Sequence, residues 1–121
     1  MTPPLTLELT PIASIVARAE ETAAQGVVIN TGAEAVTVDL VELTAPSLAL
    51  DVIDERGQLL RMLPPPTPGR PDAVVLAPGE RRPVRFDGFL PAHTPPGRYR
   101  VRFHYGDVQS EWIEVEIGGG A

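Results

Sequence analysis

The feature that most constrains the fold is an alternation of apolar and polar residues, with a period of two, near the C-terminus. One face of the first run carries Tyr99, Val101, Phe103 and Tyr105, and the other carries Arg98, Arg100, Arg102 and His104. In the second run, Ile113, Val115 and Ile117 alternate with Trp112, Glu114 and Glu116. Successive side chains of a strand point to opposite faces, so each run predicts a half-buried strand. Together the two runs predict an antiparallel hairpin.

A single register satisfies both faces of this hairpin when residues 106–110 close it and Tyr105 lies opposite Glu111. The inner pairs would be Phe103 with Ile113, Val101 with Val115 and Tyr99 with Ile117, and the outer pairs Arg102 with Glu114, Arg100 with Glu116 and His104 with Trp112. A slip of one residue would exchange the two faces. Exposed cross-strand ion pairs contribute only about 0.2–1 kcal/mol each.

The same alternation recurs through the rest of the chain. Further strands are predicted at residues 5–9, 27–29, 36–40, 48–52, 59–63, 74–76 and 84–86, with turn signals at 30–32, 54–57 and 77–80. Short strands separated by turns every eight to twelve residues, without interleaved helices, are typical of an antiparallel β-sandwich. The sequence therefore predicts an all-β domain of seven to nine strands over residues 5–117, with a small barrel as the alternative.

Two interpretations remain open for residues 10–25. Thr10 and Pro11 would suit the start of a helix, Gly26 would suit its end, and Ile12 and Ile15 follow helical spacing. The segment nevertheless lies between two strand patterns, which favours a strand or loop path.

The prolines are concentrated outside the predicted strands. Of fourteen prolines, Pro64, Pro65, Pro66, Pro68 and Pro71 fall in one predicted loop, and Pro91, Pro95 and Pro96 fall in another. Such loops are stiff and lose little entropy on binding. Pro83 is the exception within a strand, and it predicts an edge or a bulge because proline donates no ladder hydrogen bond.

Composition excludes several classes of protein. The chain of 121 residues fits one domain and contains no cysteine, which excludes disulfide frameworks, thiolate metal sites and a cysteine nucleophile. The net charge of −6 argues against a nucleic-acid partner. No apolar run is long enough for a membrane span, and residues 1–10 lack signal-peptide features, so a cytoplasmic location is expected if Met1 is the natural start. Residues 118–121 are expected to form a flexible glycine-rich tail.

Catalytic and cofactor sites find no support in the sequence. A serine hydrolase site would need Ser14, Ser47 or Ser110 beside His93 or His104, and no nucleophile-elbow pattern surrounds any of these serines. No glycine-rich phosphate loop is present. Asp51, Asp54 and Glu55 are better interpreted as a solvated turn than as a Ca²⁺ site. We therefore expect no enzyme activity, no cofactor, no metal and no small-molecule substrate.

A resemblance rests on the order of the turn and strand motifs. Residues 28–32, 36–40 and 52–57 are followed by Leu76-Ala77-Pro78-Gly79-Glu80 and then by Pro96-Gly97-Arg98-Tyr99. Over residues 25–105 this order resembles bacterial immunoglobulin-like domains and is similar to the intracellular proteinase inhibitor (BsuPI-like) family. The resemblance implies an immunoglobulin-like sandwich, in which the tyrosine fills core and its hydroxyl finds a backbone partner. It also implies inhibition of an intracellular serine protease, although no inhibitory residue can be matched.

Two surfaces are predicted to bind a partner protein. The first is the outer face of the hairpin, where Arg98, Arg100, Arg102 and Trp112 combine the residue types of interface hot spots. Arg85 is a further candidate for this face. The second is formed by the two proline-rich loops, residues 63–72 and 89–97. The first of these loops carries Pro65, Pro66, Arg70 and Pro71, and proline after arginine would resist trypsin-like cleavage there. The alternatives are a solvated, charge-neutralised face and a rigid connecting loop.

The function predicted from the sequence is that of a non-enzymatic protein-binding or structural module. A serine protease inhibitor and a subunit or decoration protein of a larger assembly are the alternatives, the latter because edge strands of a sandwich can pair with neighbours.

Overall fold

The computed structural model describes residues 4–60 and 72–118. The strands are β1 (Leu5–Pro11), β2 (Ile15–Val16), β3 (Ala23–Asn30), β4 (Val36–Asp39), β5 (Leu50–Ile53), β6 (Ala73–Leu76), β7 (Arg81–Asp87), β8 (Gly97–Tyr105), β9 (Val108–Gln109) and β10 (Ile113–Ile117). The helical segments are a 3₁₀ turn (Ala19–Glu21), α1 (Leu40–Thr44) and α2 (Pro46–Ala49). The predicted all-β class is confirmed.

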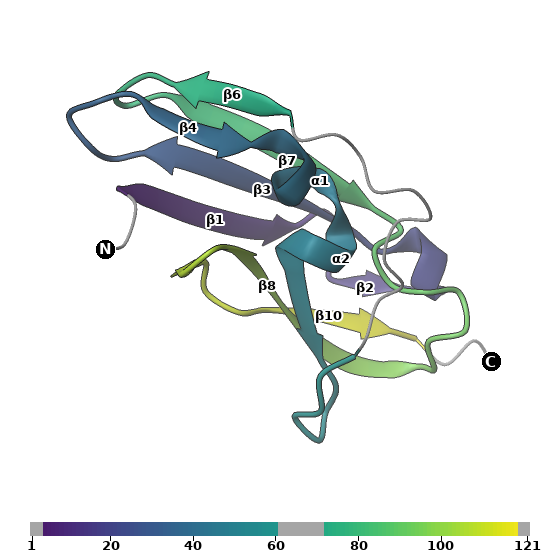
Figure 1. The fold of residues 1–121 in the computed structure, drawn as a ribbon. Coiled ribbons are helices and arrows are strands. Elements are labelled where there is room, and N and C mark those ends of the chain that lie inside the picture. The colour runs from purple at the N-terminus through teal and green to yellow at the C-terminus, as the bar shows by residue number, and fades with distance from the viewer. Residues whose placement is uncertain (1–3, 61–71, 119–121) are drawn as a thin grey trace.

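The strands form two main sheets packed face to face (Figure 1). One sheet has the order β1-β3-β7, and the other has the order β2-β10-β8-β5, with β9 pairing β8. A separate two-stranded ribbon, β4-β6, lies beside the first sheet in Figure 1. All of these pairs are antiparallel except β2 with β10. The N-terminal segment, residues 5–16, therefore contributes to both sheets, since β1 belongs to one sheet and β2 belongs to the other.

The core is built around an aromatic contact between the two sheets. Phe86 of β7 and Phe103 of β8 are both fully buried, and their rings meet edge to face with centroids 5.4 Å apart and planes at 73°. Gly26 of β3 provides the space for this pair, because a Cβ at that position would lie 2.8 Å from the Phe103 ring. Gly26 is thus a packing residue inside a strand and not the end of a helix.

Asn30 joins the end of β3 to the β4-β6 ribbon. Its buried side chain donates to the carbonyls of Glu34 at 2.8 Å and Leu76 at 3.0 Å, and accepts from the amide of Gly32 at 2.9 Å. A buried amide with every group partnered fixes local geometry, because any other arrangement leaves a desolvated polar atom unpaired. The predicted turn at residues 30–32 is therefore present, and its first residue also anchors β6.

The other predicted turns and the edge position predicted for Pro83 are confirmed. In the turn after β6, the Glu80 amide donates to the Ala77 carbonyl at 2.9 Å, and Gly79 has a φ of 78°, which fits a type II Pro-Gly turn. Pro83 lies in β7, which is at the edge of its sheet within the described strands. Its missing amide hydrogen therefore interrupts no interior ladder.

Residues 40–49 contradict the predicted strand ends. The predictions extended one strand to residue 40 and began another at residue 48, but α1 and α2 occupy this connection. Asp39 ends β4 and caps α1, its Oδ1 accepting from the Val41 amide at 3.0 Å, and Pro46 takes the first turn of α2. No helix in the described ranges is long and apolar enough to cross a membrane.

Residues 10–25 follow the strand-or-loop path. β1 continues to Pro11, β2 occupies Ile15–Val16, and helical geometry is limited to the single 3₁₀ turn. The Thr22 hydroxyl closes that turn by donating to the Ala19 carbonyl at 2.7 Å. The helical spacing of the apolar residues was therefore coincidental.

The predicted hairpin exists, but its register differs by two residues. Val101 pairs with Ile113 and Tyr99 with Val115, so the pairs predicted for both faces are wrong. The cause is a tight turn that pairs Tyr105 with Val108, after which residues 110–112 interrupt the ladder before β10 begins. A shift of two preserves which side chains face the core.

We predict that Gly26→Ala destabilises the fold by about 1–3 kcal/mol, because the added methyl group would overlap the Phe103 ring. Urea unfolding followed by tryptophan fluorescence measures the loss. Gln25→Ala, on the exposed side of the same strand, should change stability by less than about 0.5 kcal/mol. Equal effects of the two substitutions would contradict the packing role of Gly26.

Candidate functional site

The residues predicted for the outer face of the hairpin do share one face of the sheet β2-β10-β8-β5. We call Arg98, Arg100, Arg102 and Trp112 the arginine face. The three arginines alternate along β8 with the buried residues Tyr99, Val101 and Phe103, which fixes them on the solvent side. Arg85 does not join them, since it lies in the other sheet and pairs with Asp87 at 2.8 Å.

Arg102 is the best-anchored residue of the arginine face. Its Nη2 lies 2.9 Å from Asp51 Oδ2 on β5, and its Nη1 donates to Gln109 Oε1 at 3.2 Å. His104 Nε2 is 3.4 Å from the other Asp51 oxygen. The Arg102 and Asp51 side chains are 23% and 27% exposed, so this ion pair is less screened than a surface pair. Asp51 thereby holds two residues of β8 in place.

Trp112 stacks on this anchored arginine. The Arg102 guanidinium carbon lies 4.3 Å from the centroid of the Trp112 ring system, which is a cation–π arrangement. Trp112 is nevertheless 37% exposed, so no loop of the described chain covers it. The result is a large apolar ring held in a fixed orientation and open to solvent.

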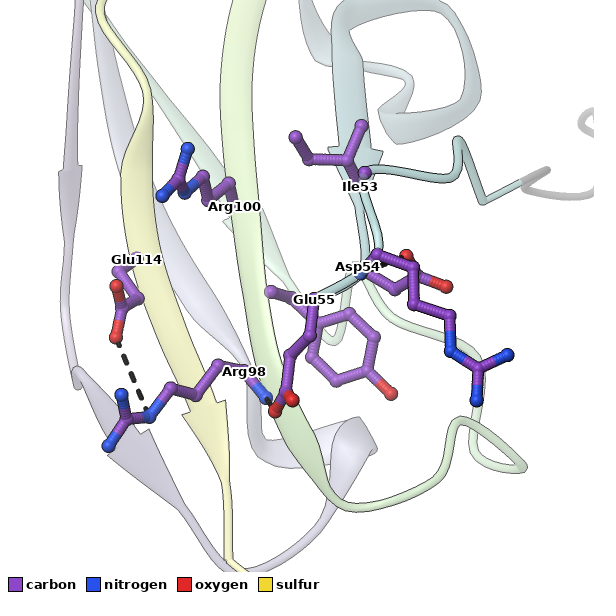
Figure 2. A pocket seen from close by; sticks show the side chains of 9 residues that line it. Ile53, Asp54, Glu55, Arg98, Arg100 and Glu114 are labelled. Atoms are coloured by element: carbon purple, nitrogen blue, oxygen red, sulfur yellow. Dashed lines mark hydrogen bonds and ion pairs between the residues drawn. The ribbon is translucent and has the colours of Figure 1, made fainter.

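Arg98 makes weaker contacts at the other end of the face. Its Nε lies 3.2 Å from Glu116 and 3.9 Å from Glu114, and its backbone amide donates to Glu55 Oε1 at 2.9 Å. Figure 2 shows Arg98 reaching across towards Glu114 while Glu55 approaches from the turn after β5. The Arg98 side chain is 66% exposed, so these ion pairs contribute little stability.

Arg100 lies between these two clusters. It is exposed, and within the described residues no carboxylate lies within ion-pair distance of it, although Glu114 is its register partner. It lines a surface depression of about 460 Å³ together with Ile53, Arg98, Glu114 and the turn 54–57 (Figure 2). The depression therefore combines charges of both signs with an apolar wall.

The arginine face is of mixed charge and not a cationic patch. The carboxylates of Asp51, Glu55, Glu114 and Glu116 all contact or adjoin it. Only Glu114 and Glu116 were expected from the sequence. Asp51 and Glu55 come from β5 and its following turn, and only strand pairing reveals that they adjoin β8.

Tyr99, near the start of β8, lines this depression. Its hydroxyl donates to the Pro95 carbonyl at 2.5 Å, as predicted for the tyrosine at the strand start. Burial, and secondarily the carboxylates of Asp54 and Glu55, raise the pKa of Tyr99 above its usual value of 10.0. The phenol therefore stays protonated and donates throughout the physiological range.

The remaining predicted sites are placed as follows. Asp54 Oδ1 accepts from the amides of Arg56 and Gln58, both at 2.9 Å, so it caps a turn. Across the described ranges, no group of three histidine, aspartate or glutamate side chains could hold a metal ion. Pro65, Pro66, Arg70 and Pro71 lie outside the described residues.

Comparison with known proteins identifies the fold. No family model matches the chain, and no curated protein matches it. The CARDB domain of a Pyrococcus furiosus protein, solved in complex with di-metal ions, has 18% sequence identity and a TM-score of 0.55, covering 96% of this chain and 89% of that one. The chain thus has an immunoglobulin-like β-sandwich fold, whereas its resemblance to the proteinase inhibitors stays an interpretation.

Two larger enzymes contain a similar structure as part of their chains. A Pseudomonas fluorescens alkylpurine DNA glycosylase bound to DNA with an abasic site analog has 12% identity and a TM-score of 0.61, covering 98% of this chain. A Listeria innocua beta-glucosidase in complex with isofagomine has 18% identity and a TM-score of 0.58, covering 95% of this chain. The match spans 32% of the glycosylase chain and 16% of the glucosidase chain.

We predict that the stability of the wild-type protein falls as the pH rises above about 10, where tyrosine ionises in the unfolded chain. The folded state keeps Tyr99 protonated to higher pH because its pKa is raised, so unfolding is favoured by ionisation in that window. Tyr99→Phe should cost about 1 kcal/mol at pH 7 through the lost hydrogen bond and should lose this alkaline decline.

Urea unfolding from pH 8 to 11 measures both effects on Tyr99. Tyr105→Phe is the control, because it leaves the Tyr99 phenol in place. Parallel curves for wild type and Tyr99→Phe would contradict the assignment.

We predict a coupling of about 0.5–1 kcal/mol between Arg102 and Trp112, since the stacked guanidinium is attracted to the ring face. A double-mutant cycle with Arg102→Ala and Trp112→Ala measures it through unfolding free energies. The same cycle on Trp112 and Arg85, which lies on β7 of the other sheet, should give no coupling. Equal couplings in the two cycles would show that the stacking contributes nothing specific.

Proposed function

We propose that this chain is a non-enzymatic protein-binding module and that the arginine face contacts its partner. The observation that carries the proposal is the exposed Trp112 ring held on Arg102, which Asp51 in turn anchors. Tryptophan and arginine are enriched among residues that dominate binding energy. A ring ordered before binding also loses less conformational entropy when a partner covers it.

Arg100 supplies the directional part of the proposed contact. It lies next to the depression and has no carboxylate at ion-pair distance among the described residues, so its guanidinium has donors to offer. A carboxylate of the partner that enters the depression would form a charge-assisted hydrogen bond there. The surrounding glutamates would disfavour a strongly acidic partner, so we infer a single acidic group beside an apolar one.

The comparisons support a modular role. In the glycosylase and the glucosidase, the similar structure occupies a minor part of a longer chain, as an accessory domain does. The hypothesis of serine protease inhibition stays a prediction, since Arg70 and Pro71 lie outside the described residues.

Affinity capture from a native lysate, followed by mass spectrometry, tests the arginine face. We predict that Trp112→Ala and Arg100→Glu each lower partner recovery about tenfold or more, as hot-spot substitutions do. Arg85→Glu makes the same charge change on the other sheet and should leave recovery unchanged. Equal recovery by all three variants, each confirmed folded by circular dichroism, would overturn the proposal.

A further inference from the structure

A second surface lies at the side of the sandwich, between the β1 edge of one sheet and the start of β10 in the other. A groove of about 510 Å³ runs between residues 6–10 of β1 and residues 111–113, which precede and begin β10. In the described chain no ladder pairs β1 with β10, although both run alongside this groove. One side of the groove is β1, which pairs only with β3 among the described strands. The other side is the start of β10, where Ile113 pairs only with β8 in the part of the chain that the structure describes.

The register shows which backbone groups of β1 are free. The Thr31 amide donates to the Pro4 carbonyl, and the Ile12 amide donates to the Ala23 carbonyl, so even-numbered residues bond across to β3. Antiparallel ladders alternate hydrogen-bonded with non-bonded pairs. The amides and carbonyls of Leu5, Leu7 and Leu9 consequently point away from β3, towards the groove.

This edge is long enough to take another strand. From Leu5 to Leu9 it extends roughly 13 Å at about 3.3 Å per residue and presents three donors and three acceptors. Addition of an extended segment to an exposed sheet edge is an established mode of peptide recognition. The side chains of these three leucines are buried in the core, so the edge is held rigidly in its extended form.

The charge and polarity of the groove indicate which side chains an added segment would have. The charged side chains at the groove are both acidic, Glu8 and Glu111. Arg81 pairs with Glu8 at 3.0 Å, whereas Glu111 has no ion pair among the described residues. Opposite β1, the groove is also lined by the apolar residues Trp112 and Ile113. Side chains of a strand alternate between two faces, so basic and apolar residues in alternation complement this groove.

We propose that the free edge of β1 binds an extended segment of a partner protein in which basic and apolar side chains alternate. The segment adds a fourth strand to the sheet β1-β3-β7. Its apolar side chains face Trp112 and Ile113, and its basic ones lie near Glu8 and Glu111. This proposal goes beyond the arginine face, with which the groove shares only Trp112.

Amide hydrogen exchange, followed residue by residue by nuclear magnetic resonance, tests the edge in the free protein. Leu5, Leu7 and Leu9 should exchange at least tenfold faster than Thr6 and Glu8, whose amides bond to β3. Equally slow exchange of both sets would overturn the proposal, because the edge would then be paired.

The occupant is tested with two peptides of seven residues, one alternating lysine with valine and the other alternating glutamate with valine. The lysine peptide should slow exchange at Leu5, Leu7 and Leu9 about tenfold or more, and the glutamate peptide should not. Protection by neither peptide, or by both equally, would overturn the proposed chemistry. Protection that grows with protein concentration alone would identify a second copy of the chain as the occupant and would likewise overturn it.

Charge reversal supplies the matched control. Glu8→Lys combined with Glu111→Lys should weaken binding of the lysine peptide about tenfold and favour the glutamate peptide. Glu20→Lys combined with Glu34→Lys makes the same net change at exposed positions away from the groove and should leave the preference intact. Arg100→Glu, measured in the lysate capture, reports separately on the arginine face, because Arg100 does not line the groove.

Discussion

The contact between Phe86 and Phe103 over Gly26 is the constraint on which the rest of the structure depends. It joins β7 to β8, one strand from each sheet, close to the C-terminal end of both, and it requires that Gly26 of the neighbouring β3 carry no side chain where the Phe103 ring lies. Once this spacing is fixed, the alternation along β8 places its arginines on the solvent side. The geometry of the arginine face is thus a consequence of how tightly the two sheets approach beneath it.

The local features of the fold could be predicted from sequence because their causes are local. Alternation along residues 97–117 identified both strands of the hairpin and the face of each side chain, and the Pro78-Gly79 pair identified its turn. The hairpin register could not be obtained in the same way. The tight turn at residues 106–107 and the interruption at 110–112 moved the pairing by two residues, a shift that leaves the apolar face of each strand unchanged. A pattern with a period of two cannot distinguish those registers.

Contacts between segments that are distant along the chain could not be predicted from the sequence for a different reason. Asp51 lies 51 positions from Arg102 and reaches it only because β5 pairs with β8. Asp39 likewise has two roles, since it ends β4 and caps α1, and so an apparently continuous apolar pattern hid a helix. For the arginine face, the sequence identified the residue types but not all of the carboxylates around them. The structure adds Asp51, which pairs with Arg102, and it shows that the Trp112 ring is ordered on that arginine.

The path of the first strand has a mechanical consequence. After β1 leaves its sheet, β2 crosses to the opposite one and pairs in parallel with β10, close to the other end of the described chain. The Glu116 amide bonds to the Ser14 carbonyl at 2.8 Å, and the Gly118 amide bonds to the Val16 carbonyl at 2.7 Å. Tension applied at residues 14 and 118 would pull these parallel segments past one another in shear, because it would act on β2 towards the N-terminus and on β10 towards the C-terminus. Their hydrogen bonds would then be strained simultaneously instead of opening one after another, so this pair of strands would resist being slid apart.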